Sequence, residues 1–300
     1  MRETIFQSFI GYKNFRYFWL AIFLSLMSIL IYSNYEPTEP NNGGTWLGYG
    51  LGTIGALLIL WLMYFGIRKR QYHSTAGTVK GWLSAHIYLG LSLIIIVTLH
   101  TGFQFGWNVH TLAYVLMCLV ILSGVWGVYA YLRYPQLMTR NRHDLSRQQI
   151  FEQLKDLDRQ TLKLAEILPS ELRIMVASAV QRAIIGGDWE SQLLAKDNSK
   201  IVVMANHLHK KSNQVVSNKD QMELSNVLAQ ALTRNRETKI VQALQELLKL
   251  TINRASLLLK LRRGIQLQAF LEIWLYIHVP LSFGLLAALV VHIFSVFIYW

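Results

Sequence analysis

The sequence predicts an all-α, polytopic membrane protein with five transmembrane helices and a helical cytoplasmic insertion. Of its 300 residues 53% are hydrophobic, and the mean hydropathy is positive, which is unusual for a soluble protein of this length. The apolar residues are concentrated in stretches that can cross about 30 Å of hydrocarbon at about 1.5 Å per residue. These stretches are Phe15–Tyr32, Trp46–Gly66, Gly81–Gly102, Thr111–Tyr131 and Ile273–Trp300.

The first apolar stretch follows basic residues, as a secretory signal would. It is longer than the core of a signal peptide, and Ser33–Thr45 contains no A-x-A-like cleavage site. We therefore expect a retained transmembrane helix.

The basic residues are distributed unevenly about the predicted spans. The net charge of +12 comes with two loops, Ser33–Thr45 and Phe103–Val109, that contain no Lys or Arg. Basic residues instead flank the spans on the opposite side: Arg2, Lys13, Arg16, Arg68, Lys69, Arg70, Lys80, Arg133, Arg140, Arg142, Lys260, Arg262 and Arg263. The positive-inside rule then predicts a cytoplasmic amino terminus and an outer carboxyl terminus, as in a bacterial inner membrane. This distribution favours membrane lipid as the cause of the charge and argues against nucleic acid.

The spans divide the chain into residues 1–133 with four helices, a cytoplasmic segment 134–265, and the fifth helix in 266–300. Within the segment we predict helices over Ser146–Leu168, Ser170–Ile185, Gln221–Arg234 and Glu237–Arg262, with a turn at Gly186-Gly187-Asp188. Asn198–Asp220 is expected to be irregular and polar. The amphipathic run Ile240–Leu261 is either a membrane-surface helix or, as base rates favour, the helix that leads into the fifth span.

Four histidines within the spans are the main functional signal. His86 and His100 lie in the third span and His278 and His292 in the fifth, each pair 14 residues apart. Fourteen residues turn a helix back to within roughly 40° and advance it about 21 Å, so both histidines share one face near opposite membrane surfaces. Histidine in hydrocarbon is costly unless its ring nitrogens are engaged.

The third and fifth spans run in the same direction, which pairs the histidines by depth. His86 and His278 are predicted to ligate an inner haem iron, and His100 and His292 an outer one, so four helices form a haem-binding bundle with two haem b groups. The alternative is four structural histidines, which requires the same spacing to arise twice by coincidence. Cys118 is the one cysteine, so no covalent haem attachment or iron–sulfur cluster is expected.

Small and basic residues suggest what would surround these haems. Gly52 and Gly66 on the second span are also 14 apart and would leave room for porphyrin, with weaker support from Gly90, Gly124 and Gly127. For the propionates we expect Arg70 or its neighbours at the inner face. The other candidates are Arg68, Lys69 and Arg262 at the inner face and Trp107, Asn108 and Tyr114 at the outer face.

Over spans two to five the chain resembles the di-haem cytochrome b superfamily. The resemblance rests on Ala85-His86-Ile87-Tyr88-Leu89-Gly90, Leu99-His100-Thr101-Gly102, Ile277-His278-Val279-Pro280-Leu281 and Val291-His292. It implies a four-helix core whose second and fourth helices, here the third and fifth spans, supply the ligands. A glycine pair on the first core helix lies against the haems, and Gly52 and Gly66 on the second span match that pair. The chain departs from this pattern in lacking a second glycine pair on the fourth span, a quinol-site motif and a short loop before the last helix. In outline it is also similar to cytochrome b-561-like two-haem cytochromes and to bacterial respiratory membrane anchors.

These features predict an electron-transfer subunit of an oxidoreductase complex, exchanging electrons between the quinone pool and a partner redox subunit. The cytoplasmic segment has no G-x-G-x-x-G, P-loop or cysteine cluster, so the donor and acceptor are expected outside the chain. Two rival functions remain: a non-redox scaffold or anchor, and a histidine-relay transporter. His73 and His110, at the inner and outer membrane surfaces, could take a quinol proton but are more often simple interfacial residues. His143, His207 and His209 are expected to be surface residues.

Overall fold

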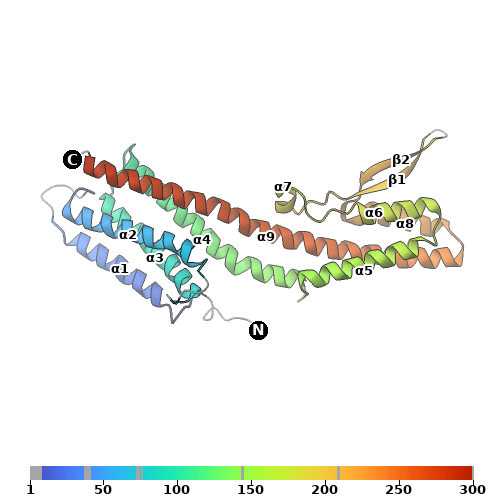
Figure 1. Ribbon diagram of the computed structural model, residues 1–300, viewed down its shortest axis with the longest axis horizontal. Coiled ribbons are helices and arrows are strands. Elements are labelled where there is room, and N and C mark those ends of the chain that lie inside the picture. Colours follow the sequence, from blue (N-terminus) through green and yellow to red (C-terminus); the bar gives the residue numbers. More distant parts are fainter. Residues whose placement is uncertain are drawn as a thin grey trace. The chain divides into compact units, whose positions relative to one another are not determined.

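The computed structural model describes residues 9–36, 42–71, 75, 77–142, 145–207 and 210–298. The chain divides into two compact units, each described below by itself: unit 1 is Met1–Tyr129 with Trp274–Trp300, and unit 2 is Ala130–Ile273. Helices α4 (Val109–Arg142) and α9 (Thr238–Ile298) contribute residues to both units (Figure 1).

Unit 1 contains α1 (Arg16–Ser33), α2 (Trp46–Arg68), α3 (Val79–Thr101) and parts of α4 and α9. All five are long and apolar enough to cross a membrane, which confirms the predicted helical membrane character. The starts of α2 and α3 are set by threonine caps, because the hydroxyls of Thr45 and Thr78 each accept a bond from the amide three residues on. The chain leaves α3 through Gly102 in the left-handed region.

The outer surface of unit 1 carries large apolar side chains. Phe23 is 59% exposed, Leu122 is 65% exposed and Phe297 is 78% exposed. Such a surface suits lipid tails and would be unfavourable in water.

The interior of unit 1 is an apolar layer to which all five helices contribute. Its members are Ala21 of α1, Ile59 and Leu62 of α2, Ala85, Leu89 and Leu93 of α3, Met117 of α4, and Leu285 and Leu289 of α9. This layer packs the two histidine-bearing helices, α3 and α9, around a common core.

Unit 2 is a mainly helical body with a core of its own. It contains α5 (Arg147–Ala165), α6 (Ser170–Gln181), α7 (Trp189–Leu193), the 3₁₀ turn η2 (Lys219–Gln221), α8 (Met222–Arg234) and the first part of α9. The four helices predicted in this segment are present, and Ser146 begins α5 with a full capping box to Gln149. Met175 and Val176 of α6, Leu228 of α8 and Leu244 of α9 pack together in its core.

The segment Asn198–Asp220 is a β-hairpin, so the prediction of an irregular segment is wrong. β1 (Lys200–His207) pairs antiparallel with β2 (Lys210–Ser217), in a register from Lys200 opposite Ser217 to His207 opposite Lys210. The physical reason is a pair of β-branched runs, Ile201–Val203 and Val215–Val216, which favour strands. The side chain of Ile201 is fully buried in the helical core.

Two buried arginines tie α9 to the rest of unit 2. The Arg262 guanidinium bonds the Asp197 carboxylate at 2.7 Å and the Ile184 carbonyl at 2.9 Å, and both charged side chains are 2% exposed. Arg254 likewise bonds the Asp158 carboxylate at 2.6 Å. Asp197 also accepts the amides of Ser199 and Asp220, so it anchors both ends of the hairpin.

Asp197→Ala should destabilise unit 2 by about 3–5 kcal/mol, because it removes the buried partner of the Arg262 guanidinium and leaves only the exposed Asp220 carboxylate, at 3.7 Å. The matched control is Asp156→Ala, which removes an exposed pair with Arg159 and should cost about 0.5 kcal/mol or less. Hydrogen exchange of the β1 amides measures the difference. Equal protection of β1 in the two variants would contradict this account of the hairpin.

Candidate functional site

The α3 histidines are oriented by backbone carbonyls of α2. His100 Nδ1 lies 2.7 Å from the Gly48 oxygen, and His86 Nδ1 lies 3.1 Å from the Leu62 oxygen. A carbonyl only accepts, so in the neutral ring each Nδ1 carries the proton and each Nε2 keeps a free lone pair. Gly48 and Leu62 are themselves 14 residues apart, which matches the spacing of the histidines that they bind.

The α9 histidines are oriented by side chains of α4. His278 Nδ1 lies 2.7 Å from the Ser123 hydroxyl, which donates its own proton to the Val120 carbonyl at 2.7 Å. Ser123 must therefore accept from His278, so His278 Nε2 also keeps its lone pair. His292 Nδ1 bonds Nδ1 of His110.

The histidines of α3 and α9 approach one another at two levels. At the outer level the rings of His100 and His292 have centres 6.0 Å apart and planes at 87°. An imidazole nitrogen lies about 2 Å from a first-row metal ion, so two rings ligating one ion from opposite sides have centres roughly 6 Å apart. At the inner level His86 and His278 lie near one another.

The glycines of α2 differ in what they contact. A Cβ on Gly52 would lie 2.7 Å from His100 Cε1, so this position must be glycine for the ring to keep its place. A Cβ on Gly66 would meet nothing within 4 Å, which leaves open space beside α2. Gly52 follows Gly48 by four residues, and Gly66 follows Leu62 by four. No side chain at these two positions therefore covers the carbonyls that bind His100 and His86.

On α4, Gly124 and Gly127 lie beside different residues. A Cβ on Gly124 would contact His278 Cε1 at 3.5 Å, whereas one on Gly127 would overlap the indole of Trp274. That indole stacks on His278 with ring centres 5.2 Å apart and donates to the Ser123 carbonyl at 2.6 Å. Gly127 thus makes room for Trp274.

Sequence reasoning missed Ser123 and Trp274. Trp274 precedes His278 by four residues, so the spacing already placed it on the ligand face of its helix. No pattern in the sequence distinguishes Ser123 from the other small residues of α4.

The basic residues suggested for the propionates lie in different surroundings. Arg70 and Lys69 are exposed after the end of α2. Arg68 is buried and donates to the carbonyls of Gln71 and Gly77, which closes the turn after α2. Arg262 belongs to unit 2, where it is committed to Asp197.

The remaining histidines are placed as follows. His110 contacts His292, whereas His73, His143 and His209 lie outside the described residues. His207 is the last residue of β1. No group of three or more His, Cys, Asp or Glu in the described part of the chain is arranged to hold a metal ion. A bis-histidine haem site needs only two protein ligands, because porphyrin supplies the others.

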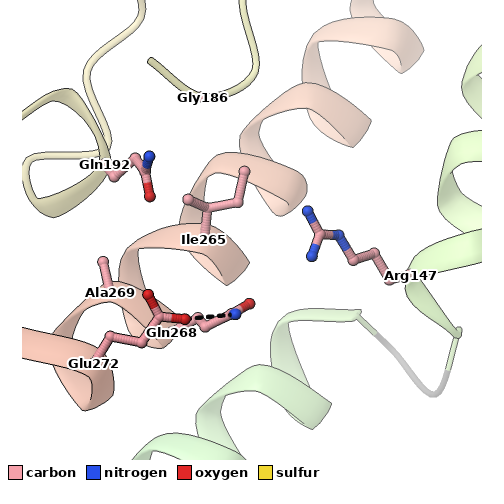
Figure 2. A pocket seen from close by; sticks show the side chains of 7 residues that line it. All are labelled: Arg147, Gly186, Gln192, Ile265, Gln268, Ala269 and Glu272. Atoms are coloured by element: carbon pink, nitrogen blue, oxygen red, sulfur yellow. Dashed lines mark hydrogen bonds between the residues drawn. The ribbon is translucent and has the colours of Figure 1, made fainter. Parts of the chain in front are cut away.

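Unit 2 has a polar pocket of its own, shown in Figure 2. Arg147, Gln192 and Glu272 are among its lining residues, and the Gln268 amide donates to the Glu272 carboxylate at 2.8 Å. Its lining contains no histidine or cysteine, so the pocket offers haem iron no ligand.

No protein-family model matches the chain, and no curated protein or solved structure matches it either. The chemistry of the site therefore rests on its donor set. Three histidines with a free Nε2 lone pair and a fourth bonded through Nδ1 form a donor set of the kind that ligates a metal ion through imidazole.

Gly52→Ala should destabilise unit 1 by about 1–3 kcal/mol, because the new methyl group overlaps His100. Gly50→Ala is the matched control two residues away: its Cβ meets nothing within 4 Å, and the change should be neutral or stabilising by up to about 1 kcal/mol. Unfolding in mixed detergent compares the two. A Gly52 variant as stable as the Gly50 variant would contradict the close contact.

Proposed function

We propose that the chain is a cytochrome b-type subunit that carries electrons across a membrane through two haem b groups. The observation that carries the proposal is that all four Nδ1 atoms are bonded. A histidine that only ties helices together gains by bonding both nitrogens in hydrocarbon, since an unpaired polar group there is costly. Among the described residues, the Nε2 atoms of these histidines have no hydrogen-bond partner.

In this proposal His86 and His278 hold the inner haem iron, and His100 and His292 hold the outer one. Haem bound at these levels supplies a reversible one-electron carrier. With two histidines holding each haem, the chemistry supplied would be electron exchange and not oxygen binding.

The apolar layer of unit 1 keeps water out of the space between the two levels. Leu89 and Leu93 of α3 lie between its two histidines in sequence, as Leu285 and Leu289 do on α9, and all four are buried. The same layer argues against a histidine-relay transporter. A relay needs a continuous polar path. Ser92 is a buried polar residue between the levels, and its hydroxyl bonds the Leu89 carbonyl of its own helix, beside the apolar residues of the layer.

The proposal also assigns surroundings and partners. Arg70 would bind inner propionates, Gly52 and Gly66 would lie against the haems, and lipid would cover the exposed apolar faces. The basic loops favour an amino terminus and a unit 2 on the cytoplasmic side of a bacterial inner membrane. The sequence lacks nicotinamide and flavin motifs, so we infer that electrons pass between the quinone pool and a separate redox subunit.

Purified protein should contain two haem b per chain by pyridine haemochrome. His100→Ala and His278→Ala should each reduce this to about one, because each removes a ligand at one level only. His207→Ala, in β1 of unit 2, is the control and should keep two. A folded wild-type chain without haem would contradict the proposal and favour a scaffold.

A short-chain quinol should reduce the haems of the purified chain if the quinone pool is the direct partner. Optical spectra follow the reaction, and dithionite gives the fully reduced reference. Haems that dithionite reduces but quinol does not would remove the quinone half of the proposal for the chain alone.

A further inference from the structure

The two α9 histidines are held by α4 in chemically different ways. His278 is held by a hydroxyl, which can donate and accept, whereas His292 is held by another imidazole, that of His110. The ring centres of His110 and His292 are 4.6 Å apart and their planes are perpendicular, at 86°. His110 is exposed in the first turn of α4, and His292 is half-buried.

One proton lies between the two Nδ1 atoms. The ring that carries this proton determines whether Nε2 of His292 has a lone pair for a metal ion. If His110 holds it, His292 must accept at Nδ1 and carry its own proton on Nε2, which prevents Nε2 from binding a metal. If His292 holds it, His110 accepts at Nδ1 and carries its proton on Nε2, which water or lipid headgroups can bond because His110 is exposed. Only the second arrangement gives His292 the tautomer that the other three histidines already have.

We propose that His110 is the positioning residue of the outer site: it accepts the Nδ1 proton of His292 and so directs Nε2 of His292 toward the outer iron. The inference rests on the proposed function, which supplies the iron. His110 thereby accepts the Nδ1 proton of His292, as Gly48, Leu62 and Ser123 accept the Nδ1 protons of the other three histidines.

The test compares His110→Ala, which removes the acceptor, with His110→Asn, whose carbonyl oxygen occupies nearly the place of Nδ1. In His110→Ala the outer haem should bind about 10- to 100-fold more weakly and its low-spin electron paramagnetic resonance signal should shift. The inner haem should not change and reports that the protein is folded. The Asn variant should recover most of the wild-type affinity and signal.

Ser123→Ala is the matched control at the other level, and it should alter the inner haem and spare the outer one. The proposal is overturned if His110→Ala leaves the outer haem unchanged, changes both haems equally, or is not rescued by Asn. It is also overturned if His292→Ala keeps a bis-histidine outer haem that His110→Ala loses, because His110 would then be the ligand.

A readout that does not need haem separates this inference from the proposed function. In protein labelled with ¹⁵N-histidine, His292 should carry its proton on Nδ1, and His110→Ala should shift this resonance. A proton on Nε2 of His292 would overturn the inference. A haem-free wild type with the expected His292 signal would contradict the proposed function but not the hydrogen bond that His110 accepts from His292.

Discussion

In a hydrocarbon environment a polar side chain keeps its place only if its donors and acceptors are engaged, and this constraint governs unit 1. The protein meets it for four histidines by bonding each Nδ1 to a neighbouring helix. Because the acceptors of His86, His100 and His278 leave the proton on Nδ1, each of these rings has a lone pair on Nε2. In the proposed function a metal ion is the second partner of that nitrogen.

The other features of unit 1 follow from the geometry that this bonding requires. The carbonyls of Gly48 and Leu62 on α2 accept the two α3 histidines at two depths. Gly52 and Gly66 have no side chains that could cover these carbonyls. α4 presents Ser123 to His278 and His110 to His292 of α9. The apolar layer between the levels then holds the helices together without adding a polar group that would need a partner of its own.

Much of this arrangement could be predicted from the sequence, because hydropathy gives the five helices and a spacing of 14 gives the two levels. The acceptors could not be predicted: every helix has carbonyls at every residue, and only packing selects those of Gly48 and Leu62. The hairpin of unit 2 was missed because the runs around Val202 and Val215 are short and lie among polar residues. The roles of Gly66 and Arg70 stay predictions, since neither residue contacts a histidine.

Electron transfer across a bilayer is the measurement that tests the central claim most directly. Vesicles containing the full chain would enclose ferricyanide, and dithionite, which does not cross the membrane, would be added outside. The account predicts that the protein accelerates reduction of the enclosed ferricyanide and that His86→Ala and His100→Ala each abolish the effect. Wild-type protein with both haems that reduces it no faster than protein-free vesicles would contradict the account.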